Sequence, residues 1–148
     1  MVLIFGAEDV SDARRAVEVT LKELDRTFGD VYGTSAGHLE FQYTARASYA
    51  LNKAFGAPIG KSFGITVGAP AAIGVLLADT AVKAANVDVV GVSTPGNGGT
   101  SFSNEVILTF SGDSGAVRQA IIAAREVGLK VLKTLDGTEP TSTTVPYI

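Results

Sequence analysis

Residue types that support metal binding and covalent chemistry are scarce in this chain. Its 148 residues include no cysteine and a single histidine, His38. The absence of cysteine excludes disulfides, thiolate nucleophiles and cysteine-ligated metal sites, and it is compatible with a reducing cytoplasm. One histidine without cysteine does not favour a zinc site, and no carboxylate cluster has the spacing of a calcium loop. The sequence therefore predicts no metal and no cofactor.

Charged residues are also sparse. Asp, Glu, Lys and Arg make up 18% of the chain, below the roughly 25% typical of soluble proteins. The net charge is −3 and the sequence has no run of basic residues that could bind a phosphate backbone, so we expect no nucleic-acid partner. Gly, Asp or Lys interrupts every apolar stretch before the roughly 20 residues of a membrane span, so we expect no membrane partner. The sparse charge favours burial against copies of the same chain, although a compact, Ala-rich monomer would have a similar composition.

The chain contains an internal sequence repeat. Residues 2–17, VLIFGAEDVSDARRAV, align with residues 106–121, VILTFSGDSGAVRQAI, at a constant offset of 104, which places Asp9 on Asp113. Each copy predicts an apolar strand, a polar turn ending in Asp and an amphipathic helix. A repeat of this length indicates duplicated domains that associate side by side.

Hydrophobic periodicity predicts a small α/β layer over most of the chain. Strands are expected at 2–5, 39–44, 63–67, 87–92 and 105–110, and helices at 45–55, 70–86 and 114–132. Residues 29–37 are rich in turn formers and predict a connector, and the Thr, Ser and Pro residues after 136 predict an extended, partly disordered tail.

Two motifs resemble catalytic signatures but lie in the wrong context. Residues 56–62, GAPIGKS, have three residues between the glycines where a phosphate-binding loop needs four, and they follow a helix and precede a strand. Ser114 lies in a GDSG motif, but a nucleophilic serine needs a base, and His38 falls in a Gly-flanked connector. The repeat instead predicts that the carboxylate of Asp113 caps a helix N-terminus. We therefore expect no catalytic residue and no enzyme, with an enzyme built on Ser114 or Lys61 as a rival hypothesis.

The loop at 93–104, STPGNGGTSFSN, is the candidate binding segment. It is long for a link between two strands, since hairpin loops usually take 2–5 residues, and surplus length is typical of functional or mobile loops. Its uncharged groups can bond neutral polar solutes but cannot transform them; a merely solvated loop would have the same composition. The candidate solute-contacting residues are Ser93, Thr94, Gly98, Thr100, Ser101, Phe102, Ser103 and Asn104.

Three segments carry a resemblance to a known family: HLEFQYTARASYALNKAFGAPIG (38–60), TAVKAANVDVVG (80–91) and EVILTFSGDSGAVRQAIIAAREVG (105–128). They resemble bacterial microcompartment shell proteins of the tandem-domain, trimer-forming type. The resemblance implies an α/β (α+β) layer, namely a circularly permuted shell domain with a ferredoxin-like small sheet and helices on one side. Under this interpretation the chain comprises the final strand and helix of an incomplete first shell domain (1–33), a complete second shell domain (38–135) and an extended tail (136–148).

The same resemblance implies a function without catalysis. Family members are structural proteins of a shell in the bacterial cytoplasm, where trimers that mimic hexamers tile with copies of themselves and with other shell proteins. By position, Lys83 and Asn86 would lie at the tile edge, and the loop 93–104 would approach a pore for small polar solutes such as 1,2-propanediol or glycerol. Members of the family are normally longer, so the sequence is interpreted as a fragment. The alternative is a ligand-binding regulatory domain with a ferredoxin-like fold, in which this loop closes over a metabolite.

Overall fold

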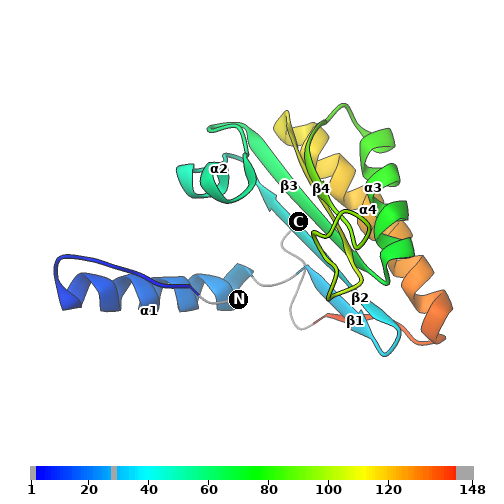
Figure 1. Ribbon diagram of the computed structural model, residues 1–148, viewed down its shortest axis with the longest axis horizontal. Helices are drawn as coiled ribbons and strands as arrows, with labels where there is room; N and C mark the ends of the chain where they lie inside the picture. The colour runs from blue at the N-terminus through cyan, green and yellow to red at the C-terminus, as the bar shows by residue number, and fades with distance from the viewer. Residues whose placement is uncertain (1–2, 28–29, 143–148) are drawn as a thin grey trace.

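The computed structural model describes residues 3–27 and 30–142 (Figure 1). The helices are α1 (Val10–Thr27), α2 (Tyr49–Phe55), α3 (Ala71–Ala84) and α4 (Ser114–Asp136). The strands are β1 (Val31–Thr34), β2 (Gly37–Thr44), β3 (Ser62–Ala69), β4 (Asp88–Ser93), β5 (Val106–Gly112) and β6 (Thr141–Ser142).

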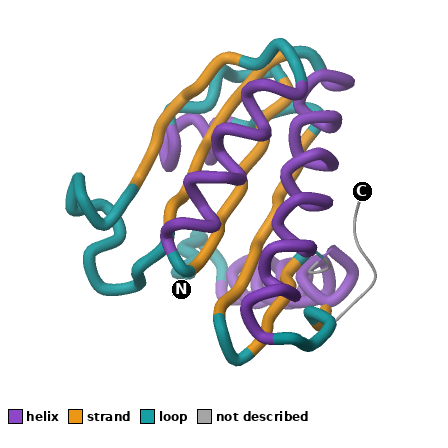
Figure 2. The backbone as a smooth tube through the Cα atoms, turned by 90° about the vertical axis from the view of Figure 1, so that its right-hand side faces the viewer, coloured by secondary structure: helices purple, strands orange, loops and turns teal. Residues whose placement is uncertain are grey.

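A single six-stranded sheet organises the chain after α1. Its strand order is β4-β5-β3-β2-β1-β6, and every neighbouring pair is antiparallel. Helices α3 and α4 lie side by side across one face of this sheet (Figure 2). The expected layer, with its two long helices on one side, is confirmed; the short helix α2 lies over the opposite face near one end of β3 (Figure 1).

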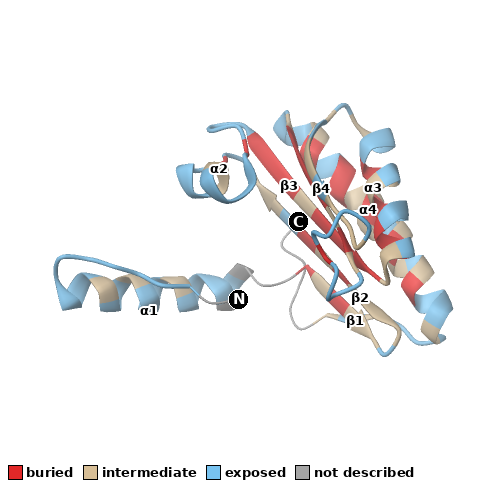
Figure 3. Ribbon diagram, in the orientation of Figure 1, coloured by how far each residue is buried: buried red, intermediate tan, exposed pale blue. Residues whose placement is uncertain are grey.

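The main core lies between the sheet and the pair α3 and α4. Figure 3 shows the buried residues concentrated along this contact. It is built from alternate positions of the strands and one face of each helix, as period-2 and period-3.6 hydrophobic patterns require. Its fully buried large side chains include Leu39, Phe41, Leu77, Leu108, Phe110, Val117, Ile121 and Leu132.

Glycines set the distance between α3 and the sheet. A Cβ on Gly74 of α3 would lie 2.6 Å from the carbonyl oxygen of Gly68 in β3 and 2.6 Å from the Cβ of Val106 in β5. A Cβ on Gly68 would lie 2.7 Å from the Cα of Gly74. Both distances are shorter than real Cβ contacts, so neither position accommodates a side chain without movement of the backbone.

Helix α2 is shorter than the sequence predicts. Residues 45–48 do not belong to the helix, because the backbone there pairs with the start of β3. The amide of Ala47 donates to the carbonyl of Lys61 at 2.7 Å, and the amide of Gly60 donates to the carbonyl of Ala47 at 2.9 Å. The second bond takes the Ala47 carbonyl, which a helix from residue 45 would use for the amide of Leu51, so the expected start at residue 45 is wrong.

The expected connector at 29–37 contains strand β1, which pairs with β2 and straddles the expected domain boundary at residue 33. An ion pair anchors this strand to α4, with 3.0 Å between Arg125 Nη1 and Oδ1 of Asp30, a residue that is 2% exposed. Burial and the neighbouring Asp30 carboxylate both raise the pKa of the Tyr32 phenol. Strand β6 of the expected tail pairs with β1, and residues 143–148 lie outside the described residues.

The first copy of the repeat folds only in part as expected. Residues 3–9 form no strand, so the strand predicted at 2–5 is wrong over its described residues. Helix α1 does begin where the repeat predicts, because its first residue, Val10, is equivalent to Ser114, the first residue of α4. A strand needs a neighbour for its backbone groups, and none of the described residues pairs with this segment. Asp113 does occupy the N-cap position of α4, but its side chain makes no capping hydrogen bond, which corrects that part of the prediction.

Candidate functional site

The candidate loop joins β4 to β5 at one end of the sheet. Strand β4 is an edge strand, and it runs antiparallel to β5, so the loop 93–104 projects beyond the sheet with both of its ends close together (Figure 1). The residues from Thr94 to Glu105 belong to no helix or strand. Most of them are exposed, and only Thr100 is buried, at 5% exposure. Seven of the eight predicted solute-contacting residues therefore lie in this loop, with Thr100 buried among them, and the eighth, Ser93, ends β4.

Asn97, which the sequence analysis did not select, organises the first half of the loop. Its side-chain oxygen accepts the amide of Thr94 at 2.8 Å and the amide of Gly99 at 3.1 Å. Its side-chain nitrogen donates to the carbonyl of Val92 at 2.9 Å. The available signal was the dipeptide Asn97-Gly98, a common turn former, because Gly98 has a φ of +80° that a side chain would disfavour.

The hydroxyl groups of the second half bond mainly within the loop. Thr100 Oγ1 donates to the carbonyl of Glu105 at 2.5 Å, Ser101 Oγ donates to Gly98, and Ser103 Oγ donates to Thr100. The hydroxyl hydrogens at these three positions are therefore already used in hydrogen bonds to backbone carbonyls. The oxygen lone pairs of the exposed residues Ser101 and Ser103 stay available, because a hydroxyl that donates one bond can still accept others, whereas Thr100 is buried.

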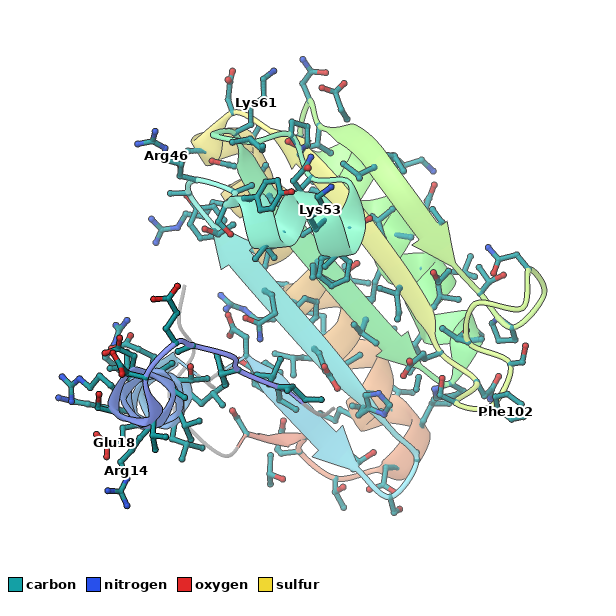
Figure 4. The ribbon with its side chains drawn as sticks, turned by 60° about the vertical axis from the view of Figure 1, so that its left-hand side comes forward. Arg14, Glu18, Arg46, Lys53, Lys61 and Phe102 are labelled. Atoms are coloured by element: carbon teal, nitrogen blue, oxygen red, sulfur yellow. The ribbon has the colours of Figure 1, made fainter. Side chains whose placement is uncertain are left out.

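The loop carries one large apolar side chain that is fully exposed. Phe102 has a relative exposure of 107%, and Figure 4 shows it at the outer edge of the molecule. Asn104 follows with a φ of +50°, a left-handed conformation that asparagine tolerates better than most residues. This conformation turns the chain back towards β5.

The two predicted edge residues lie at the opposite end of β4. Lys83 is in the last turn of α3, and Asn86 follows that helix just before β4 begins; both are exposed. Lys83 Nζ lies 2.7 Å from Oδ2 of Asp79, one helical turn earlier, and the two side chains form an ion pair. At about 3.3 Å per residue, β4 separates Asn86 from the loop by roughly 20 Å. The candidate edge and the candidate solute loop are therefore distinct sites.

The catalytic alternatives gain no geometric support. The Ser114 hydroxyl lies 2.5 Å from the Tyr43 hydroxyl, whereas His38 Nε2 lies 3.3 Å from Oε2 of Glu105. Tyr43 and His38 are at opposite ends of β2, about 17 Å apart at the rise of a strand, so Ser114 has no imidazole beside it. Lys61 lies between α2 and β3, an order that gives no helix N-terminus for a phosphate.

The described ranges, 3–27 and 30–142, contain neither a cluster of metal-ligating residues nor a membrane-spanning helix. Within them, no group of three or more His, Cys, Asp or Glu residues is arranged to hold a metal ion. No helix in the same ranges combines the length and the apolar character that crossing a membrane requires.

Comparison with known proteins gives a consistent result. A family model for the BMC domain matches residues 62–142. The bacterial microcompartment shell protein PduB of Salmonella typhimurium is 67% identical over 147 residues, which cover 99% of this chain and 54% of that protein. PduB of Limosilactobacillus reuteri is 52% identical over 99% of this chain and 61% of its own length. The chain thus spans little more than half the length of these curated relatives.

Solved structures extend the match to the fold. The crystal structure of a trimeric shell protein PduB superposes with a TM-score of 0.89 at 52% identity, over 97% of this chain and 62% of that one. EtuB from Clostridium kluyveri gives a TM-score of 0.90 at 53% identity, over 96% and 62% of the two chains. Since the family model covers more than half of the sequence and the relatives match nearly all of it, this chain belongs to the BMC-domain family of bacterial microcompartment shell proteins.

Proposed function

We propose that the chain is a non-enzymatic structural subunit of a bacterial microcompartment shell in the bacterial cytoplasm. In this role it forms trimeric tiles that mimic hexamers and pack against copies of themselves and other shell proteins. The observation that carries the proposal is the match over nearly the whole chain to proteins named as shell components, one of which is described as trimeric. The separation of Ser114 from His38 supports the absence of catalysis.

The loop 93–104 lines a passage for small polar solutes in this proposal. Support comes from the position of edge strand β4, which extends from Lys83 and Asn86 at one end to the loop at the other. A tile needs contacts at its perimeter and an opening away from them, and the two ends of β4 offer these two places.

Selection in such a passage would rest on size and hydrogen bonding. The loop contains no charged residue between Ser93 and Asn104, so it neither traps nor repels ions strongly. Its hydroxyl oxygens and backbone groups can replace part of the hydration shell of a diol or triol. Solutes of the class of 1,2-propanediol and glycerol fit this chemistry, whereas bulky apolar molecules gain nothing from it.

Helix α1 belongs to a first shell domain in the same proposal. Under the offset of the repeat, Val17 is equivalent to Ile121, which is 0% exposed in the contact between α4 and the sheet. Val17 itself is 43% exposed, and α1 lies apart from the sheet (Figure 1). We propose that residues 1–33 supply the last strand and helix of that domain, that 38–135 form the second domain, and that 136–148 form its tail. The strand of the first domain would form only where a neighbouring strand pairs with it, and β1, at the boundary, pairs with β2 of the second domain.

Solute flux through assembled sheets tests the passage. Ser101→Trp places a bulky ring in the loop and should lower glycerol flux several-fold, because the aperture would narrow without loss of the fold. Ser48→Trp is the matched control, since Ser48 is also exposed and its side chain makes no capping bond. Equal flux through both variants would contradict a passage at this loop.

Light scattering distinguishes the alternative function. A regulatory domain would remain a monomer and bind a metabolite tightly, whereas a shell subunit should form trimers and larger sheets at the same protein concentration.

A further inference from the structure

We propose that Asn97 is the positioning residue of the solute loop: its side-chain amide fixes the loop shape that sets the size selectivity of the passage. The inference rests on the proposed function, because it concerns the same loop. Asn97 is not offered as a solute ligand, and it acts through the groups that it holds.

A flexible sequence explains why the loop needs such a residue. Gly96, Gly98 and Gly99 lie within four consecutive positions, and glycine loses more conformational freedom on ordering than any other residue. Without a fixed partner, this stretch would sample many conformations. A passage with a flexible rim would have no defined aperture, so selection by size requires that the rim be held.

The Asn97 side chain supplies that constraint through three hydrogen bonds. It accepts from the amides of Thr94 and Gly99 and donates to the carbonyl of Val92. The Asn97 amide in turn donates to Thr94 Oγ1 at 3.0 Å. These bonds tie the glycine stretch to the end of β4, the most regular structure near the loop.

Close packing restricts the loop at the same point. A Cβ on Gly99 would lie 2.8 Å from the Cβ of Ser93 and 3.1 Å from Oδ1 of Asn97. The backbone of Gly99 therefore lies directly against the end of β4, where the Asn97 oxygen holds its amide. The bond and the close approach specify one conformation together.

The constraint reaches the residues that face the solute. The amide of Thr100 donates to the carbonyl of Thr94 at 3.3 Å, and Ser101 Oγ donates to the carbonyl of Gly98 at 3.1 Å. The carbonyl of Thr100 then accepts the amides of Ser103 and Asn104, each at 3.2 Å. A movement of residues 94–99 must therefore displace Ser101 and the residues that follow it, 102–104.

Two substitutions of Asn97 test its two acceptor bonds and its one donor bond separately. Asn97→Ala removes all three side-chain bonds, and Asn97→Asp keeps both acceptor bonds but loses the donor to Val92. The matched control is Asn52→Ala, which also removes an asparagine bond to a backbone carbonyl, that of Ala57 at 3.0 Å, but outside the loop. The variants are compared as assembled sheets by amide hydrogen exchange and by the flux ratio of glycerol to the larger polyol sorbitol.

Asn97→Ala should accelerate exchange at the amides of Thr94 and Gly99 at least tenfold and lower the glycerol-to-sorbitol ratio several-fold. Asn97→Asp should lie between Asn97→Ala and the unsubstituted protein, and Asn52→Ala should change neither quantity. Unchanged selectivity despite faster exchange, or unchanged exchange, would overturn the role of Asn97. The proposed function fails separately, if Ser101→Trp leaves glycerol flux unaltered.

Discussion

Thr66 and Thr109 are two buried threonines of the sheet that differ in one hydrogen bond. Thr66 is 1% exposed and its hydroxyl has no partner among the described residues, whereas Thr109 Oγ1 donates to the carbonyl of Gly91 at 3.2 Å. An unsatisfied buried hydroxyl costs free energy that a methyl group of similar shape would not. Thr66→Val should therefore raise the free energy of unfolding by about 1 kcal/mol, measured by urea denaturation.

Thr109→Val is the control for this prediction. It removes a hydroxyl that has a partner and leaves the carbonyl of Gly91 without that bond, so it should lower the free energy of unfolding by about 1 kcal/mol. The two variants should change the free energy of unfolding in opposite directions, although both replace a hydroxyl group by a methyl group. If both variants are destabilised alike, Thr66 has a hydrogen bond in solution.

For individual residues, sequence chemistry identified the loop but not the hydrogen bonds that its side chains make. Composition and length selected Ser93 to Asn104, because Ser, Thr and Gly in a long link are visible without a structure. Composition cannot tell a free hydroxyl from one that donates to a carbonyl nearby, as Thr100 does. Asn97 was missed for the same reason, since its three bonds depend on the turn that Gly98 permits.

At the scale of elements, the contact between α3 and the sheet depends on the missing side chain at Gly74. Alanine has the higher helix propensity, by about 1 kcal/mol, yet its Cβ would clash with backbone and with Val106. Overpacking of this kind costs about 1–3 kcal/mol. Gly74→Ala should therefore lower the midpoint of urea unfolding, even though it favours the helix itself.

Gly115 in the first turn of α4 provides the matched comparison. Nothing lies within 4 Å of the position its Cβ would take. Gly115→Ala should leave stability unchanged or raise it by up to about 1 kcal/mol, as helix propensity alone predicts. A loss of stability at Gly115 equal to that at Gly74 would show that packing against β3 is not the cause.

The elements that sequence periodicity predicted well are those that bury a regular face. Strands β3 to β5 and helices α3 and α4 all fall near their expected ranges, because their apolar spacing matches the core that they build. The failures share a different cause. Ala47 bonds to the backbone of Gly60 and Lys61, and the four-residue strand β1 forms a tight hairpin with β2; neither pairing leaves a periodic signature. The strand expected at 2–5 lacks a neighbour among the described residues.

For the whole molecule, assembly should depend on Lys83 while folding does not. Its side chain is 73% exposed and its ion pair with Asp79 is worth about 0.5 kcal/mol or less. Lys83→Ala should leave the melting temperature nearly unchanged but reduce the sheets seen by electron microscopy. Lys130→Ala, the same charge change at an exposed position of α4, should assemble normally. Normal sheets from Lys83→Ala would refute the edge assignment.

Helix α1 and the segment before it expose several large apolar side chains. The exposed apolar residues of α1 and the segment before it are Leu3, Ile4, Phe5, Val10, Val17, Val19, Leu21 and Leu24. Burying such side chains is worth about 1.5–3 kcal/mol each, so a shell tile should cover them. In the protein as its gene encodes it, Val17→Asp should therefore place a carboxylate in an apolar contact and lower both thermal stability and incorporation into shells.

Arg14→Asp is the control on the same helix, because the Arg14 side chain points away from the rest of the molecule in Figure 4. Its repeat equivalent is Arg118, also exposed, so no contact is expected to be lost at this position. Stability and incorporation should stay close to those of the unsubstituted protein. If both variants incorporate equally well, α1 remains exposed in the shell, and residues 1–33 are a linker rather than the final strand and helix of a first shell domain.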